Sequence, residues 1–291
     1  MVESTGFENR QAGNGLEGSN PSLSAVNKVN FMEARNISEK VLPIVRETRA
    51  ITLPSFGIAA VDSRKSEQAH DVVTKTDLAV EEFLESRLAD VVPGAGFYGE
   101  EFGHKGNKET FWLCDPVDGT AHYVRGMPFC TTMLALIDHG KVVFGAVYDF
   151  VRDELYHAEL GKGAYMNESP IHVSERSKND WYLAWESHIE KEENLKRFVR
   201  LRDSAALIKF MCCGYELAMV ASGKLDGRVV FDGWGKDWDY AAGSIIVSEA
   251  GGVVANLGAK TYGYRNHDFI AANKEVFQHL TEGPDTIFPV F

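Results

Sequence analysis

The sequence predicts an α/β protein in which sheets and helices stack as layers within a single compact body. Two observations support this fold class. Apolar runs of strand length alternate with stretches whose apolar residues recur at helical spacing. In addition, no internal repeat and no clear linker divides the chain after about residue 30.

Helical spacing first appears in residues 33–53. A second helix is expected to run through Ala89, with Asp77 as its capping residue. Further helices are expected over 192–201, 215–222, 239–249 and 274–280.

The clearest strand signals lie in the middle of the chain. Phe111–Asp115 reads as a buried strand, and Asp138-His139-Gly140 separates two apolar runs, 131–137 and 142–148, as in a hairpin. Residues 154–158 and 229–231 are further expected strands.

Composition excludes several broad functions. The net charge of −12 over 291 residues argues against a general nucleic-acid binder, because phosphate backbones select basic surfaces. No apolar run approaches the roughly 20 residues needed to span a bilayer, so no membrane partner is expected. An anionic substrate stays possible, since bound metal ions would reverse the local field.

Four cysteines, Cys114, Cys130, Cys212 and Cys213, form no CxxC pair. We expect reduced, buried thiols in a cytoplasmic protein, with a redox or zinc role as the alternative. Residues 1–31, rich in Gly, Ser and Asn, are expected to be a disordered extension. Gly18-Ser19-Asn20-Pro21 matches what a transfer-RNA gene would encode if translated, which suggests Met32 as the native start.

The most informative segment is the strand end that leads into Gly119-Thr120. It carries Asp115 and Asp118 on either side of Pro116. Two crowded carboxylates are unfavourable unless a cation or proton lies between them, and oxygen ligands suit Mg²⁺. The glycine exposes backbone N–H groups of the kind that bind phosphate. This segment therefore predicts a metal ion beside a phosphate.

Other acidic residues indicate a functional site only when they are considered together. Glu100 and Glu101 alone read as a solvated pair, and Asp239 alone reads as part of a helix start. His122 lies close enough to Thr120 for substrate contact, although an ordinary hydrogen bond is the simpler interpretation. Several acids at strand ends and helix starts predict one pocket that needs compensating cations.

Five ordered motifs resemble the inositol monophosphatase family of Mg²⁺-dependent, lithium-sensitive phosphatases. The resemblance covers about residues 33–282. In chain order the motifs are Asp71-Val72-Val73-Thr74-Lys75-Thr76-Asp77, Gly99-Glu100-Glu101, Asp115-Pro116-Val117-Asp118-Gly119-Thr120, 161–167 with 170–174, and 238–243 running on to 249–252.

The resemblance implies an αβαβα layered sandwich similar to fructose-1,6-bisphosphatase, with residues 32–291 as one phosphatase domain made of two α/β halves. It implies hydrolysis of a small phosphate monoester by a metal-activated water, with two or three Mg²⁺ ions. A homodimer and inhibition by lithium are further implications.

By resemblance, Glu100 and Asp115 bind the first metal ion, assisted by the backbone carbonyl of Val117. Asp115, Asp118 and Asp239 would bind a second ion. Glu100 is thus both a ligand and a member of the catalytic set.

The remaining implied roles concern water and substrate. Asp77 would lie near a third, weaker metal site and, with Thr120, would orient the attacking water. The N–H groups of Gly119 and Thr120 would bind phosphate oxygens. Asp239 and Asp232 would contact the substrate, although Asp232 also reads as a turn residue.

Ala121-His122 replaces the Thr-Asn pair usual in the family, so the pocket is expected to be reshaped. The leading substrate is an inositol monophosphate or a related sugar or polyol phosphate. Alternatives are fructose-1,6-bisphosphatase, 3′-phosphoadenosine phosphatase and histidinol-phosphate phosphatase activities, and a non-enzymatic regulator. A nucleotide would need an aromatic or Arg platform, which the sequence does not locate.

Overall fold

The computed structural model describes residues 37–67 and 72–289. Residues 36–291 form one compact unit. The predictions for residues 1–31 and for a start at Met32 lie outside the described residues, and the domain boundary at residue 32 stays a prediction.

The larger of the two main sheets has eight strands in the order β10-β9-β8-β7-β6-β5-β3-β4. Its neighbours pair antiparallel except β3 and β5, which are parallel. The strands are β3 (Gly96–Gly99), β4 (Gly103–Lys105), β5 (Thr110–Asp118), β6 (Thr131–Asp138), β7 (Lys141–Asp149), β8 (Glu154–Glu159), β9 (Ala164–Met166) and β10 (Ser169–Pro170).

A second sheet of five strands has the order β12-β11-β13-β15-β14. Strand β11 pairs parallel with β12 and β13, whereas β15 is antiparallel to β13 and β14. The strands are β11 (Tyr182–Glu186), β12 (Ala206–Ile208), β13 (Gly227–Val230), β14 (Val253–Asn256) and β15 (Phe269–Ala272), and β1 (Ser63–Arg64) pairs separately with β2 (Val72–Val73).

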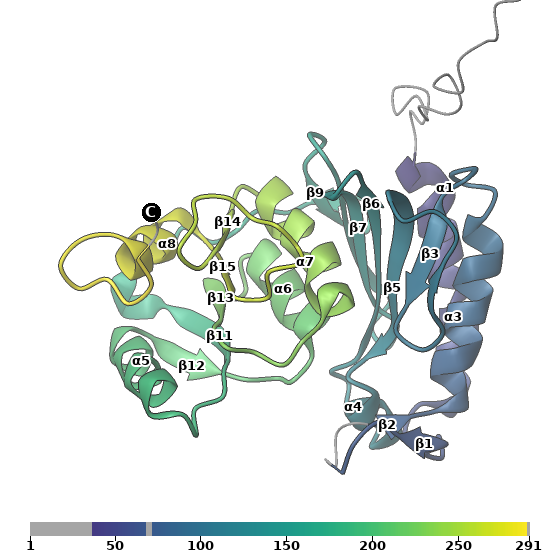
Figure 1. The fold of residues 1–291 in the computed structure, drawn as a ribbon, viewed down its shortest axis with the longest axis horizontal. Coiled ribbons are helices and arrows are strands. Elements are labelled where there is room, and N and C mark those ends of the chain that lie inside the picture. The colour runs from purple at the N-terminus through teal and green to yellow at the C-terminus, as the bar shows by residue number, and fades with distance from the viewer. Residues whose placement is uncertain (1–36, 68–71, 290–291) are drawn as a thin grey trace, which may run out of the picture. The chain divides into compact units, whose positions relative to one another are not determined.

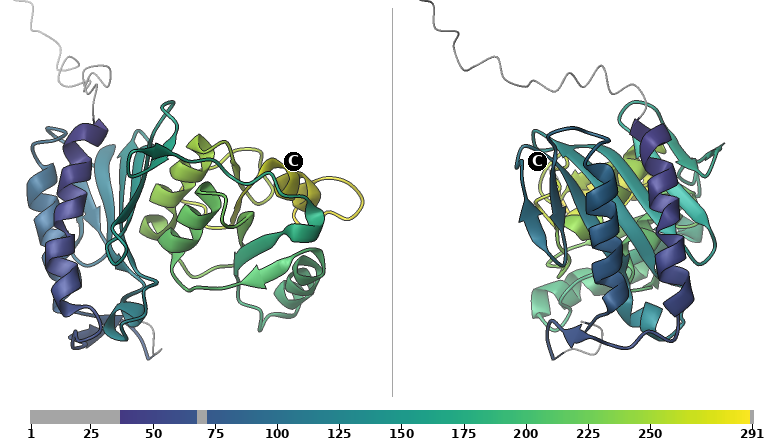
Figure 2. Two further views of the ribbon diagram at one scale, coloured as in Figure 1. Left: turned by 180° about the vertical axis from the view of Figure 1, so that it is seen from behind. Right: turned by 90° about the vertical axis from the view of Figure 1, so that its right-hand side faces the viewer.

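Helices complete five layers (Figure 1). Helices α1 (Ile37–Glu47) and α3 (Lys75–Leu88) cover the outer face of the larger sheet. Helices α6 (Cys213–Ala221) and α7 (Asp237–Glu249) lie between the two sheets, and α5 (Glu192–Ser204) and α8 (Lys274–Thr281) flank the smaller sheet, as Figure 2 also shows. Short helices are α2 (Arg49–Thr52), α4 (Thr120–Val124), η2 (Leu53–Ser55) and η3 (Lys178–Asp180). The predicted αβαβα sandwich is confirmed.

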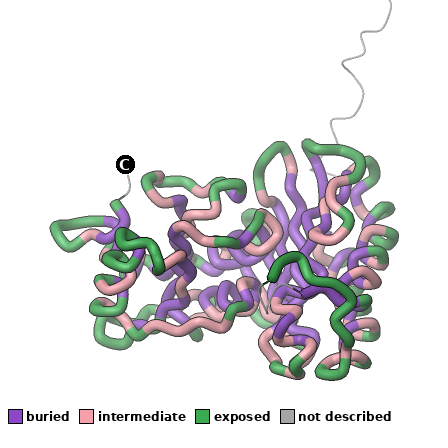
Figure 3. Tube along the Cα trace, turned by 60° about the horizontal axis from the view of Figure 1, so that its bottom comes forward, coloured by how far each residue is buried: buried purple, intermediate pink, exposed green. Residues whose placement is uncertain are grey.

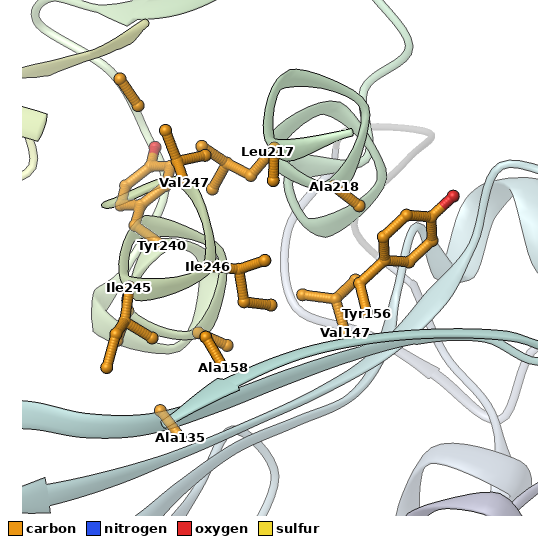
Figure 4. Close-up of a cluster of buried hydrophobic side chains, with 14 of the residues drawn as sticks. Ala135, Val147, Tyr156, Ala158, Leu217, Ala218, Tyr240, Ile245, Ile246 and Val247 are labelled. Carbon is orange, nitrogen blue, oxygen red and sulfur yellow. The ribbon is translucent and has the colours of Figure 1, made fainter. Parts of the chain in front are cut away.

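The core lies where α6 and α7 meet the eight-stranded sheet. Figure 4 shows Val147 of the sheet facing Ile246 of α7. Close approach depends on small residues: a Cβ on Gly145 would lie 2.5 Å from the carbonyl oxygen of Ala242. Strands β5 and β6 and most of α7 are buried, whereas many of the exposed residues lie in loops (Figure 3).

Local predictions were accurate where the pattern was strong. The hairpin of β6 and β7 is confirmed, as are α5, α6, α7 and α8 with shifted ends. The prediction that Asp77 is the helix cap was wrong. Thr74 is the N-cap of α3, and Asp77 is the third helical residue, whose carboxylate accepts from the Thr74 backbone in a capping box.

Candidate active site

A cavity of about 480 Å³ receives residues from both halves of the unit. The eight-stranded half contributes the acidic motif at the end of β5, and the five-stranded half contributes residues of β11, β13 and the starts of α6 and α7. Predicted site residues that line it are Glu100, Asp115, Val117, Asp118, Gly119, Thr120 and Asp239.

Strand β5 places two of these carboxylates. The sequence predicted a strand that ends at Asp115, but β5 continues through Pro116 to Asp118, with a register shift against β6 between the two aspartates. The ladder accommodates the proline, which lacks an N–H donor, at this irregularity. Both side chains therefore line the cavity.

Glu100 follows β3 in a loop whose backbone donates hydrogen bonds to a buried carboxylate. Glu81 of α3 accepts hydrogen bonds from the N–H groups of Glu101 at 2.8 Å and Phe102 at 2.9 Å. Gly99 permits this approach, because a Cβ there would lie 2.0 Å from Glu81 Oε1. The Nζ atom of Lys65 lies 2.6 Å from Glu100 Oε1 and 2.8 Å from Glu101 Oε1.

Asp118 and Asp239 are each fixed by backbone N–H groups. Gly214 N donates to Asp118 Oδ2 at 2.6 Å, and the Cys212 thiol donates to the same oxygen at 3.1 Å. Asp239, in the first turn of α7, accepts from Lys236 N at 2.5 Å. These bonds fix the carboxylates without neutralising them.

The electrostatics of this cluster favour a bound cation. Burial, then the charges of Glu100, Asp118 and Asp239, raise the pKa of Asp115 well above its usual range. Burial likewise raises the pKa values of Asp118 and Asp239. Asp115 Oδ1 is buried and has no hydrogen-bond partner among the described residues. An unpartnered carboxylate oxygen amid further carboxylates fits a hard divalent cation such as Mg²⁺.

Asp77 reaches the same region from α3. Its Oδ1 accepts a hydrogen bond from Thr120 Oγ1 at 3.0 Å, while Oδ2 accepts from Thr74 N at 2.9 Å. Thr120 Oγ1 also lies 2.8 Å from the carbonyl oxygen of Val117. Burial raises the pKa of Asp77, and the bonds from Thr74 and Thr120 oppose that rise.

Gly119 connects β5 to α4 with φ of +82°, a left-handed conformation that favours glycine. A Cβ there would also lie 2.6 Å from the carbonyl oxygen of Phe129. His122 bonds to that same oxygen through Nδ1 at 3.0 Å and lines the cavity. The ordinary hydrogen bond expected for His122 is present.

The wall from the five-stranded half holds a buried ionic network that sequence reasoning missed. Glu186 of β11 accepts from Arg228 Nη2 at 2.5 Å, from the Tyr240 hydroxyl at 2.7 Å and from Trp234 N at 2.9 Å. Arg228 also pairs with Glu216 of α6. Burial alone would lower the pKa of Arg228, but Cys213 and Glu186 raise it, so the guanidinium stays charged.

The same wall carries a lysine between two indole rings. Lys209 Nζ lies 4.1 Å from the ring centroid of Trp234 and 4.8 Å from that of Trp185. All three residues line the cavity. Lys209 has no hydrogen bond or ion pair to a carboxylate within the described residues. The sequence did not locate these aromatic side chains in the cavity.

Asp232 is not brought to the cavity. Its Oδ2 accepts from Asn194 Nδ2 at 2.5 Å and from Lys191 Nζ at 2.6 Å, and its backbone φ is +53°. The Lys191 hydrogen bond lowers the pKa of Asp232. The turn interpretation describes this position, and the structure offers no support for a substrate contact there.

Fold and site together define a layered α/β protein with a buried carboxylate centre. A family model described as the inositol monophosphatase family matches residues 27–283, so the chain belongs to that family. It is 28% identical over 267 residues to the inositol-1-monophosphatase of Bacillus subtilis, covering 87% of this chain and 97% of that protein.

Two further similarities bear on function. The chain is 32% identical over 194 residues to a Nus factor SuhB from Xylella fastidiosa, covering 64% of this chain and 70% of that protein. The solved structure of a Thermotoga maritima IMPase superposes with a TM-score of 0.74 at 26% identity, covering 82% and 93% of the two chains. Family membership supports a phosphatase of the hydrolase class. None of the helices in the described part of the chain could cross a bilayer.

Proposed function

We propose that this protein is an Mg²⁺-dependent phosphatase that hydrolyses a small phosphate monoester, with inositol monophosphate or a related sugar or polyol phosphate as the leading substrate. The observation that carries the proposal is Asp115 Oδ1, which is buried and has no partner in the described part of the chain, in a cavity that Glu100, Asp118 and Asp239 also line. A site that had lost its catalytic function would have no physical reason to keep such crowded charges.

The proposed metal ligands are the cavity carboxylates and one backbone oxygen. Glu100, Asp115 and the Val117 carbonyl would bind one ion, and Asp115, Asp118 and Asp239 a second. Bound Mg²⁺ supplies Lewis acidity and lowers the pKa of its bound water. No basic side chain is then needed to deprotonate the attacking water. Two or three ions are proposed.

Around the metal ligands, this chain's own groups would position water and phosphate. Asp77 Oδ1 accepts a hydrogen bond from the Thr120 hydroxyl, and with this support the hydroxyl would orient the attacking water. The N–H groups of Gly119 and Thr120 lie at the start of α4, where the first turn lacks intrahelical acceptors, and would bind phosphate oxygens.

The cavity wall from the five-stranded half favours one alternative group of substrates for the proposed phosphatase. Lys209 is a cavity cation with no carboxylate partner among the described residues, and two indole rings restrict its ammonium. Burial lowers its pKa, so desolvation makes an anionic partner valuable. A substrate with a second anionic group, as in a sugar bisphosphate or a phosphorylated nucleotide, would supply that partner.

The test is phosphate release from a panel of monoesters, with Mg²⁺ and with EDTA. The panel contains inositol 1-phosphate, fructose 1,6-bisphosphate, 3′-phosphoadenosine 5′-phosphate and histidinol phosphate. Mg²⁺-dependent release supports the proposal, and millimolar LiCl is expected to inhibit it. No release from any of them by folded, metal-bound protein would favour the regulator function suggested by the name of the Xylella relative.

A Lys209→Met variant separates the substrate branches, because methionine keeps the apolar stem and removes the charge. If the second anion binds Lys209, KM for a bisphosphate is expected to rise about 10-fold while KM for inositol 1-phosphate changes little. Equal effects on both substrates would reject this alternative. Lys224→Met, whose ammonium lies over Tyr156 outside the cavity lining, is the matched control.

A further inference from the structure

The thiol of Cys213 lies among the cavity carboxylates, and the proposed phosphatase chemistry does not use it. Its Sγ, one oxygen of Asp118 and one oxygen of Asp239 all lie within 4.8 Å of one another. We propose that these three residues form a binding site for a thiophilic divalent cation such as Zn²⁺, overlapping the proposed second Mg²⁺ position.

Three packed elements hold the donor atoms in place. Asp118 ends β5, Cys213 begins α6 and Asp239 lies in the first turn of α7. Gly214, the neighbour of Cys213, donates its N–H to Asp118 Oδ2 at 2.6 Å, which ties the start of α6 to that carboxylate. A Cβ on Gly214 would lie 2.7 Å from Met133 Sδ, so glycine allows this close approach.

A second observation also points to a cation. Asp115 Oδ1 lines the same cavity, is buried and has no hydrogen-bond partner among the described residues. The charges of Asp118 and Asp239 act on Asp115, so it lies near the two carboxylates of this set. Structural Zn²⁺ sites are commonly tetrahedral, with ligand atoms about 3.5 Å apart, so the donor atoms of Asp118, Cys213 and Asp239 would draw together around the ion and a water molecule could supply the fourth ligand.

Burial raises the pKa of the Cys213 thiol well above its usual range and Arg228 opposes that rise, so the metal-free protein carries the neutral thiol. Arg228 Nη2 donates to Cys213 Sγ at 3.3 Å. A guanidinium beside sulfur stabilises the thiolate, and a thiolate prefers Zn²⁺ or Cd²⁺ to Mg²⁺. On binding, the S–H proton leaves to solvent and the sulfur–metal bond forms, with no change of oxidation state.

Cadmium is the probe, because a Cd²⁺–thiolate bond gives an ultraviolet charge-transfer band that carboxylates do not give. One equivalent of Cd²⁺ is expected to produce this band in the native chain, and Zn²⁺ to suppress it. Cys213→Ser should lose the band, whereas Cys130→Ser, which changes a buried thiol outside the cavity lining, should keep it. A band that persists in Cys213→Ser, or none in the native protein, would overturn the proposal.

A second variant and a second readout guard against misfolding. Cys213→Val replaces the thiol with an apolar group that cannot bind metal, and its melting temperature with Mg²⁺ reports whether the fold is intact. Where the proposed phosphatase activity is measurable, half-inhibition should need at least about 10-fold more Zn²⁺ in Cys213→Val than in the native chain. The cadmium band needs no substrate, so failure of the proposed function would leave this test intact.

Discussion

Thr120 Oγ1 lies 3.0 Å from Asp77 Oδ1, joining the start of α4 to the first turn of α3 across 43 residues of sequence. The same hydroxyl lies 2.8 Å from the Val117 carbonyl oxygen. Its single hydrogen can serve only one of these acceptors at a time, so the hydroxyl can also accept a hydrogen bond from a water molecule. The proposed water-orienting role of Thr120 needs this free acceptor capacity.

Removal of this hydroxyl should slow the proposed reaction. Thr120→Val keeps the side-chain shape, and we expect kcat to fall about 100-fold because the water loses its orienting group. Thr120→Ser should retain most activity. Thr132→Val is the control, since its hydroxyl donates to the Pro116 carbonyl outside the cavity lining. A kcat for Thr120→Val within about twofold of the native value would exclude the role.

Asp115→Asn tests the metal centre. The amide removes a negative charge from a buried cluster, so we expect at least a ~100-fold loss of activity through loss of metal binding. Calorimetric titration with Mg²⁺ should show correspondingly weaker binding. Asp203→Asn, at an exposed residue whose one ion-pair partner within residues 37–67 and 72–289 is Arg202, should change neither quantity. Near-native turnover of Asp115→Asn at saturating Mg²⁺ would contradict the assignment.

Gly119→Ala tests the turn that presents the phosphate-binding N–H groups. We expect the free energy of unfolding to fall by more than about 1–2 kcal/mol, because a left-handed φ adds to the clash with the Phe129 carbonyl. Gly94→Ala separates the two causes, since Gly94 has φ of +83° and open space around its Cβ position. Urea unfolding curves measure both variants, and equal losses would show that the clash contributes nothing.

The sequence predicted the site best where its signal is local. Asp115, Asp118 and Gly119 lie within one strand end and its turn, so their proximity follows from covalent connection alone. Asp239 could be joined to them only through the family resemblance. The cavity that holds both groups confirms that they meet, although their roles remain proposals.

The ionic network in the cavity wall from the five-stranded half could not be predicted from the sequence, for a physical reason. Glu186 and Arg228 are 42 residues apart and become neighbours only through the parallel pairing of β11 with β13. A five-residue strand leaves too short a pattern to predict that pairing. Asp232 differs for another reason: its left-handed turn and its bonds to Lys191 and Asn194 are tertiary features that the motif resemblance does not show.

His157 should make stability depend on pH. Its ring is buried in β8, Nε2 donates to the Asn167 carbonyl at 3.0 Å, and the ring stacks on Tyr165 at 5.5 Å. Burial lowers the pKa of His157 below its usual 6.5, and the Asn167 hydrogen bond only partly opposes this. The unfolded chain therefore binds more protons below about pH 6.5, so the free energy of unfolding falls as the pH drops below that value.

A His157→Gln variant isolates this contribution, because glutamine can donate to Asn167 but does not titrate. We expect its unfolding free energy, measured in urea from pH 5 to pH 7.5, to fall less steeply with acid than that of the native chain. His172→Gln, at an exposed histidine, should leave the native slope unchanged. Parallel curves for the native chain and His157→Gln would mean that His157 has the same pKa in the folded and the unfolded chain.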